Sequence, residues 1–223
     1  MKIVILIVAN DYPEHYLEMQ NIWRLYMNSF QNIKSYFLKA DENIKEDIIL
    51  NEDESTFYIR QPETQTPGVL KKTIKTIEYV LKNMDFKYIF RTNLSCCLDL
   101  KKFYNFCHQD FNYAAQEGIL NKIIFGSGAG VFFSRGVCEY LISIKDSIDY
   151  CKENEDVTIG SILYPIYGLL CVSRIDIFNF DSKSISDEEI KNSDTFHIRC
   201  KNNEDPSLTI YNMKKIYELF YQN

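Results

Sequence analysis

The sequence predicts an α/β fold, with one domain over residues 1–223 and a mainly parallel central sheet flanked by helices. Short apolar runs rich in β-branched residues alternate with longer amphipathic stretches, an order typical of a doubly wound sheet. Of the 223 residues, 46% are hydrophobic and 25% are charged, which suits a domain with a sizeable core. No internal repeat, low-complexity segment or linker divides the chain.

The first third of the chain predicts strands and helices in turn. Residues 3–9 form an apolar run that fits a buried first strand, and it passes into Asn10 without the small-residue cleavage pattern of a signal peptide. Apolar residues then recur at roughly helical spacing. We expect a helix over residues 16–30, strands over 35–38 and 47–50, a loop over 61–68 and a helix over 70–83.

The stretch over residues 86–100 is expected to contain the central strand. Residues 88–90 are apolar, and the chain then becomes polar at Arg91, Thr92, Asn93 and Ser95. Ligands of open α/β sheets bind at the carboxyl edge of such strands, so these side chains are candidate ligand contacts. The alternative interpretation is an ordinary strand that ends in an ordinary loop.

The remaining elements continue the alternation. We expect a helix over residues 100–107 with Asp99 as its cap, and two strands over 123–125 and 131–133 joined by a glycine turn. Helical patterns follow over 136–147 and from 157 to 163, then a strand over 175–178 and a closing helix over 213–221. The segments 51–68 and 181–194 are expected to form the loops that shape a binding pocket.

Charge and composition exclude some functions. The net charge is −6 and no lysine-arginine stripe is present, so nucleic acid is not expected as a partner. No apolar run approaches the roughly 20 residues that span a bilayer, so no intrinsic membrane segment is expected. The seven cysteines include no Cys-x-x-Cys pair and are expected to be reduced core thiols of a cytoplasmic protein. None of these sequence features predicts an oligomeric state.

Five short blocks occur in an order that resembles a known family. They are LKKT at 70–73, YIFRTNLS at 88–95, GSGAGVFFSR at 126–135, EDVTIG at 155–160 and FHIRCK at 196–201. Together they resemble glycosyltransferases of the GT-A (Rossmann-like) fold, specifically the β-1,3-galactosyltransferase and Fringe-like group. RTNLS is also similar to the strand end of uncharacterised glycosyltransferase-like proteins of bacteria and large DNA viruses.

The resemblance implies transfer of a sugar from a nucleotide-diphosphate donor to a hydroxyl of a glycan or protein-linked acceptor. Asp156, with Glu155 beside it, matches the carboxylate that deprotonates the acceptor in inverting members of the family. A positioned carboxylate of this kind contributes about a hundredfold or more in rate. The alternative interpretation is that both residues favour the start of the next helix through its dipole.

The sequence departs from the family at the central strand. The family carries an acidic Asp-x-Asp run that holds Mn²⁺ or Mg²⁺, whereas this chain has Asn93, Leu94 and Ser95. Amide and hydroxyl groups are weak partners for such cations. Three expectations stay open: donor binding without a tightly held metal, a weak site in which the donor phosphates and His197 hold the ion, or loss of catalysis.

Positive charge near the C-terminus offers another way to neutralise the donor phosphates. His197, Arg199 and Lys201 alternate, so on an extended segment they point to one side. Guanidinium and ammonium groups suit phosphate oxygens. A solvated strand face with His197 packed above it is the alternative.

The family pattern adds further candidates. The glycine turn containing Gly126, Ser127, Gly128 and Ala129 is expected near the sugar and acceptor, with a plain hairpin turn as the alternative. Lys72 could reach a donor phosphate or face solvent. Candidates for the nucleotide follow the first two strands: Ala9, Asn10, Asp11 and Asp41.

Two functional hypotheses result from these residues. The first is a glycosyltransferase of the hexosyltransferase type, which is inverting and has weak or no dependence on a metal. The second is a non-catalytic subunit that binds a sugar nucleotide or a glycan. The missing acidic pair favours the second hypothesis, and Asp156 together with the basic residues favours the first.

Overall fold

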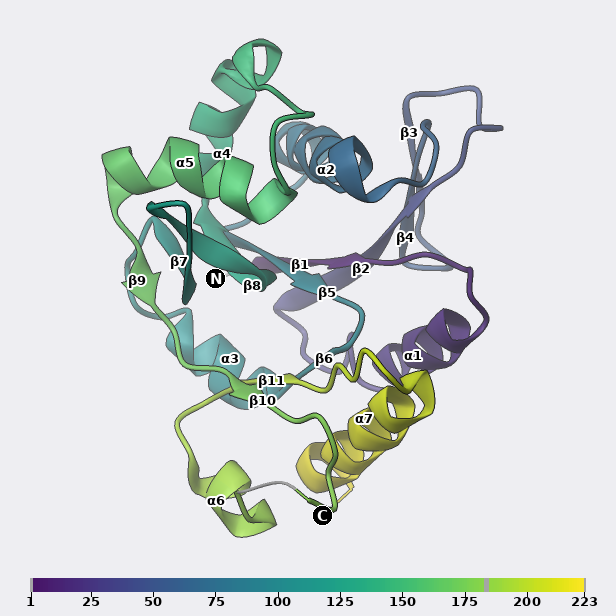
Figure 1. Ribbon diagram of the computed structural model, residues 1–223. Coiled ribbons are helices and arrows are strands. Elements are labelled where there is room, and N and C mark those ends of the chain that lie inside the picture. The colour runs from purple at the N-terminus through teal and green to yellow at the C-terminus, as the bar shows by residue number, and fades with distance from the viewer. Residues whose placement is uncertain (1, 183–184, 223) are drawn as a thin grey trace.

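The computed structural model describes residues 2–182 and 185–222 and confirms an α/β fold with helices on both faces of a large sheet (Figure 1). The strand order is β3-β4-β2-β1-β5-β8-β7-β9. The block β4-β2-β1-β5 is parallel, β7 and β8 pair antiparallel with each other and β8 with β5, and β3 pairs antiparallel with β4. The strands are β1 Ile3–Val8, β2 Ile33–Ala40, β3 Ile48–Asn51, β4 Thr56–Ile59, β5 Tyr88–Asn93, β7 Tyr113–Leu120, β8 Ile123–Ser134 and β9 Leu170–Cys171.

Helices cover the two faces in separate groups (Figure 1). One face carries α2 Leu70–Asn83, α4 Arg135–Ser143 and α5 Glu155–Tyr167. The other carries α1 His15–Arg24, α3 Leu100–Phe106, α6 Asp187–Asn192 and α7 Pro206–Tyr221, together with a small sheet in the order β10 Ile175–Asp176, β11 His197–Arg199 and β6 Cys96–Leu98. Short helical turns occur at η1 Gln65–Val69 and η2 Lys145–Ser147.

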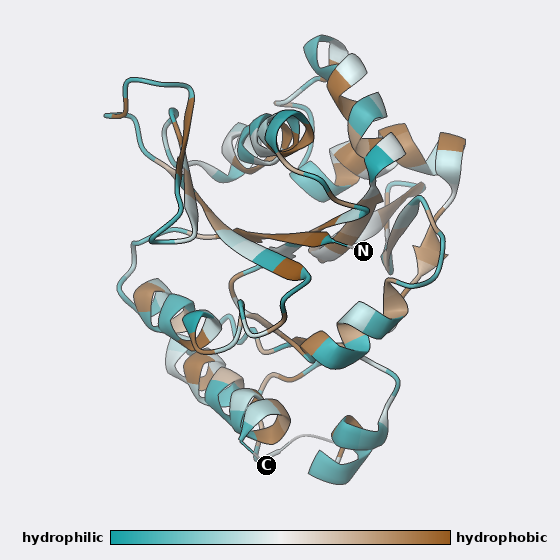
Figure 2. Cartoon of the chain, turned by 180° about the vertical axis from the view of Figure 1, so that it is seen from behind, coloured by the Kyte–Doolittle hydropathy of each residue, from teal (hydrophilic) through white to brown (hydrophobic). Residues whose placement is uncertain are grey.

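The central strands are apolar on both sides because helices bury both faces of the sheet. In β1, Ile3, Ile5 and Ile7 join the core beneath α1 and α7, whereas Val4 and Leu6 join the core beneath α2. Hydrophobic residues accordingly concentrate on the strands and hydrophilic residues on loops and outer helix surfaces (Figure 2).

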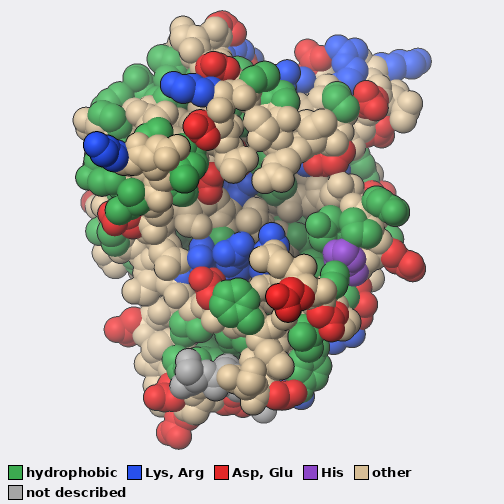
Figure 3. Space-filling view, viewed as in Figure 1, with side chains coloured by type: hydrophobic (Ala, Val, Ile, Leu, Met, Phe, Trp, Pro, Cys, Tyr) green, Lys and Arg blue, Asp and Glu red, His purple; other side chains and the backbone are tan. Residues whose placement is uncertain are grey.

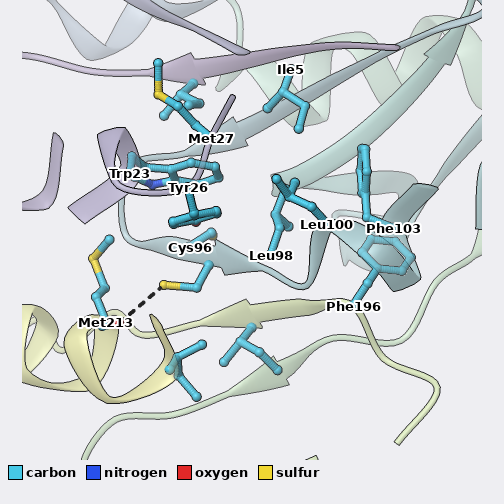
Figure 4. Packing of buried hydrophobic residues seen from close by; sticks show 14 of the residues in the cluster. Ile5, Trp23, Tyr26, Met27, Cys96, Leu98, Leu100, Phe103, Phe196 and Met213 are labelled. Carbon is cyan, nitrogen blue, oxygen red and sulfur yellow. Dashed lines mark hydrogen bonds between the residues drawn. The ribbon is translucent and has the colours of Figure 1, made fainter. Parts of the chain in front are cut away.

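Trp23 of α1 connects the core beneath α1 and α7 to the segment that follows the central strand β5. Its indole is fully buried and stacks on Tyr26 at 5.1 Å (Figure 4). It donates a 2.8 Å hydrogen bond to the carbonyl of Leu94. A buried carbonyl needs such a partner, because its desolvation would otherwise cost about 1–3 kcal/mol. Trp23 therefore fixes the segment between Asn93 and Ser95.

Several expected elements have different boundaries in the structure. The helix expected over residues 16–30 ends at Arg24, and the strand expected over 88–90 continues to Asn93. The strands β4 and β7 were not expected. β4 follows an acidic stretch inside the segment 51–68, which was expected to form a loop. β7 lacks a clear alternation of apolar and polar residues. Asp99 caps α3 as expected and accepts from the backbone N–H groups of Lys101 and Lys102.

The expected glycine turn is wrong. β8 runs without interruption through the segment Gly126–Gly130, and the turn before it lies at Asn121 and Lys122, which have φ of 50° and 67°. The glycines instead allow close packing: a Cβ on Gly126 would lie 2.9 Å from the Tyr113 hydroxyl oxygen, and one on Gly130 would lie 2.2 Å from Cε1 of His197.

The cysteines and the apolar segments can be located in the structure. All seven cysteines are free thiols, but only five are buried, because Cys151 and Cys171 are exposed. Across residues 2–182 and 185–222, no helix has the length and apolar character required to cross a membrane. The segment expected as a loop over 181–194 contains α6, and its residues 183–184 lie outside the described residues.

We predict that Gly160→Ala strongly destabilises the fold. A Cβ at Gly160 would lie 2.1 Å from Cβ and 2.6 Å from Cα of Phe125, so α5 would be pushed away from β8. Urea unfolding should show a loss of about 1–3 kcal/mol or more. The matched control is Gly136→Ala in α4, where no atom lies within 4 Å of the added Cβ. Equal stability of the two variants would contradict this packing.

Candidate active site

A cleft of about 1020 Å³ opens at the carboxyl ends of β1 and β5. Its walls come from the first turn of α1, the loop before η1, the strands β7 and β8, the start of α5, and the segments around Arg174 and Arg199. In the space-filling view the cleft is a hollow near the centre of this face, and lysine and arginine side chains gather along it (Figure 3). A second hollow of about 630 Å³ includes Lys87 and Arg135 but none of the sequence-predicted site residues.

Twelve of the eighteen predicted site residues line this cleft. They are Ala9, Asn10, Arg91, Asn93, Ser95, Ser127, Gly128, Ala129, Glu155, Asp156, Arg199 and Lys201. The tip of the central strand and the C-terminal basic segment therefore face one space, as the sequence predicts. A 2.9 Å hydrogen bond from the N–H of Cys200 to the carbonyl of Ser95 joins these two segments directly.

Arg91 and Glu155 form an ion pair that is buried in the cleft wall. The side chains are 5% and 6% exposed, and both Nε and Nη2 of Arg91 contact the carboxylate. Nη1 of Arg91 donates to Oδ1 of Asn93 at 2.9 Å and to the carbonyl of Gly128. Thr73 also donates to Glu155. Burial raises the pKa of Glu155, and Arg91 and Thr73 act in the opposite direction.

These contacts give Glu155 a structural role instead of the catalytic role that was expected. The sequence pattern placed it beside Asp156 as part of the catalytic carboxylate pair. In the structure both its oxygens are engaged by Arg91, and Thr73 adds a third contact, so its carboxylate holds the wall together. Asp156 remains as the half-buried carboxylate at the cleft.

Asp156 occupies the first turn of α5, where backbone N–H groups and the helix dipole favour a carboxylate. Its Oδ2 accepts a 3.0 Å hydrogen bond from the N–H of Gly128, and its Oδ1 accepts one of 3.0 Å from Val157. A Cβ on Gly128 would lie 3.2 Å from Oδ2, so the absent side chain allows this approach. The carboxylate is thus held in a defined position with lone pairs left for a ligand.

Three arginines line the cleft, and only two of them have partners. Arg174 binds Asp176 through two hydrogen bonds of 2.8 and 3.0 Å and donates to Oγ of Ser127 at 2.9 Å. Arg91 is paired with Glu155. Among the described residues, the guanidinium of Arg199 has neither an ion pair nor a hydrogen bond, and its Nε is buried without a partner. Lys201 is exposed and likewise has no carboxylate within the described parts of the chain.

His197 is not a lining residue of the cleft. Its ring is 3% exposed and packs on Gly130, where a Cβ would overlap it, and its Nε2 has no partner. Burial lowers the pKa of His197 to about 3, and the charges of Arg174 and Arg199 add to this effect. The imidazole is therefore neutral at ordinary pH, and its place in the expected metal site is not supported by its surroundings.

Five further predicted residues lie outside the cleft lining. The ammonium of Lys72 is buried and binds the two Glu63 oxygens at 2.7 and 2.8 Å, so this residue does not face solvent. Asp11 pairs with Lys39 at 2.6 Å, and Asp41 accepts from Asn43. Thr92 donates to the carbonyl of Ala129 at 2.6 Å, and Gly126 donates to the Tyr113 hydroxyl at 2.7 Å.

Several lining residues were missed by the sequence interpretation. Gln116 lies at the register shift of β7 between Ala115 and Glu117, and its Oε1 is buried without a partner. Bulges of this kind redirect side chains next to functional sites. Arg174, Asn154 and Glu63 also line the cleft. Their loops have no periodic pattern, so only the fold brings them to this position.

Comparison with solved structures identifies the fold. A glycosyltransferase involved in the glycosylation of the major capsid of PBCV-1 aligns with a TM-score of 0.59 over 96% of this chain and 100% of its own, at 10% identity. The galactosyltransferase LgtC, in complex with donor and acceptor sugar analogs, aligns with a TM-score of 0.52 over 98% and 95%, at 10% identity. The chain has the GT-A glycosyltransferase fold.

The apo form of the glycosyltransferase GlyE from Streptococcus pneumoniae TIGR4 also aligns, with a TM-score of 0.50 at 10% identity, over 100% of this chain and 64% of its own. No protein-family model matches the sequence, and no curated protein sequence matches it either. At these identities the likeness concerns the GT-A fold itself, and the Fringe-like group stays a prediction.

We predict that Glu155→Gln is costly, because it leaves the buried charge of Arg91 without its counter-charge. Removing one partner of a buried ion pair costs about 3–5 kcal/mol, so the midpoint of urea unfolding should fall markedly. The control is Asp47→Asn, which removes the exposed partner of Arg60 and should cost at most about 1 kcal/mol. Similar losses in both variants would contradict the buried pair.

The buried His197 predicts a specific pH dependence of stability. Its pKa is about 3 in the folded protein, and that of an unfolded histidine is near 6.5. As pH falls below about 6.5 the unfolded chain takes up a proton that the folded chain does not, so stability should decline by up to about 1.4 kcal/mol per pH unit. Unfolding of the parent and His197→Asn proteins between pH 7 and 5 tests this, and an unchanged slope in the variant would refute it.

Proposed function

We propose that this protein transfers a sugar from a nucleotide-diphosphate donor to a hydroxyl group of a glycan or protein-linked acceptor. The observation that carries the proposal is that one cleft contains a held carboxylate, Asp156, and two cations without protein partners, Arg199 and Lys201. Transfer from such a donor needs both kinds of group, because the acceptor loses a proton while the diphosphate leaves with additional negative charge. The GT-A fold supports the same assignment.

The cleft residues suggest how the donor lies. The diphosphate would contact Arg199 and Lys201 on one side and the amide and hydroxyl of Asn93 and Ser95 on the other. The nucleoside would extend toward Asn10 at the end of β1, next to the first turn of α1. The sugar would then point toward Ser127 and Gly128 and so approach Asp156.

In this arrangement Asp156 acts as a general base. It removes the proton from the acceptor hydroxyl as the oxygen forms a bond to the anomeric carbon, and the bond from that carbon to the phosphate oxygen breaks. The nucleoside diphosphate keeps the bonding electrons, and the nearby cations stabilise the charge it gains. Attack opposite the leaving group inverts the anomeric centre, in agreement with the inverting, hexosyltransferase-type activity expected from the resemblance.

A second candidate function is binding without catalysis, as a subunit that holds a sugar nucleotide or a glycan. The substitution of the acidic pair by Asn93 and Ser95 favours this candidate. Asp156 and the unpartnered cations favour the enzyme, because a pure binding site would not need a carboxylate aimed at the same space.

The first experiment measures thermal unfolding with a panel of UDP-, GDP- and dTDP-sugars, with and without manganese. Donor binding should raise the midpoint by mass action. If no sugar nucleotide shifts the midpoint under either condition, the transferase and a subunit that binds a sugar nucleotide are both excluded.

For a donor that binds, we predict that Asp156→Asn lowers transfer or slow donor hydrolysis by about a hundredfold or more, because the base is lost. The donor-induced shift in melting should persist, since the amide preserves the shape of the site. The control is Asp53→Asn, an exposed carboxylate outside the cleft. Equal turnover by the Asp156→Asn and parent proteins would exclude Asp156 as the base. Binding without any turnover would favour the non-catalytic candidate.

A further inference from the structure

We propose that the cleft holds the donor diphosphate through Arg199 and Lys201 without a divalent cation. This inference rests on the proposed function, because it concerns the same donor. It differs from the metal-assisted donor binding that the family resemblance implies.

The residues expected to hold a metal do not fit one. Asn93 and Ser95 present neutral groups, and Oδ1 of Asn93 already accepts a hydrogen bond from Arg91. His197 is buried with two arginine charges acting on it. In the part of the chain that the structure describes, no three His, Cys, Asp or Glu side chains are grouped so that they could hold a metal ion. A hard divalent cation prefers carboxylate oxygens, which these positions lack.

The pairing of the arginines indicates where an anion binds. Arg91 and Arg174 each have a carboxylate of this chain, whereas the half-buried Arg199 has none. The Nε of Arg199 is buried without a hydrogen-bond acceptor, and leaving a buried donor unpaired is costly, so this group indicates an external acceptor. Planar guanidinium groups match phosphate oxygens through two parallel hydrogen bonds.

The backbone places Lys201 beside this group. Arg199 and Lys201 are two residues apart and both line the cleft, while the N–H of the intervening Cys200 bonds to the carbonyl of Ser95. The two cations are thereby anchored next to the tip of β5, which Trp23 also fixes through its hydrogen bond to Leu94. A diphosphate that lies along this edge would meet both cations together with the amide of Asn93.

The test is calorimetric titration of UDP, GDP, dTDP and inorganic pyrophosphate, first in EDTA and then with MnCl₂ or MgCl₂. We expect a nucleoside diphosphate to bind in EDTA, with Kd changed less than about threefold by the metal. Arg199→Gln should weaken binding in EDTA at least about tenfold, since a charge-assisted contact is lost, and Lys201→Gln should weaken it less. Arg60→Gln, at an exposed arginine outside the cleft, is the matched control.

A second variant tests whether carboxylates at the tip of β5 create metal-dependent nucleotide binding. Asn93→Asp combined with Ser95→Asp supplies two carboxylates, and Arg91 can donate to an aspartate at position 93 as it does to the asparagine. We expect this variant to bind the nucleotide more weakly in EDTA and to regain binding with manganese, because the carboxylates repel phosphate until a cation joins them.

The outcomes separate this inference from the proposed function. Binding that appears in the parent protein only with a metal would overturn the metal-free site and leave the proposed function intact. Unchanged affinity in Arg199→Gln would also overturn it. Absence of nucleotide binding under every condition would overturn both proposals.

Discussion

The buried ion pair between Arg91 and Glu155 is the interaction on which the cleft depends. It joins the end of the central strand β5 to the first residue of α5, two elements that are far apart in the sequence. The same guanidinium binds Asn93 and the carbonyl of Gly128, and Gly128 in turn donates to Asp156. One charged group therefore sets the relative positions of the tip of β5 and the Asp156 carboxylate. A pair this deeply buried is costly to break, which favours a rigid site.

Close packing at glycines complements this charge network. Gly128 leaves room for the carboxylate of Asp156, Gly130 for the ring of His197, and Gly160 for the backbone of β8 at Phe125. Each contact brings another element against the same strand, so the glycines allow α5 and β11 to approach the sheet closely. The glycine-rich stretch thus serves as a strand that other elements contact directly.

The charge distribution in the cleft is compatible with the proposed anionic donor and hydroxyl acceptor. Arg91 and Arg174 are neutralised within the chain and act on the geometry of the wall, whereas Arg199 and Lys201 stay available to a ligand. Asp156 lies in the first turn of α5, a helix start that stabilises its negative charge. The proposed sugar transfer from a diphosphate requires cations and a general base at separate positions, and these side chains meet that requirement.

The sequence by itself determined the α/β class and the helix over residues 70–83, because period-two and helical patterns report burial directly. That the Asn93 tip lies in one cleft with Arg199 and Lys201 was expected only from the family resemblance. Only the tertiary structure decided which ionisable groups are paired. Glu63 with Lys72, Glu155 with Arg91 and Asp176 with Arg174 neutralise one another. The burial of His197 against Gly130 and the placement of Gln116 and Arg174 likewise depend on contacts between distant segments. Local patterns contain no information on such contacts, since charge pairing depends on distances that only the folded chain sets.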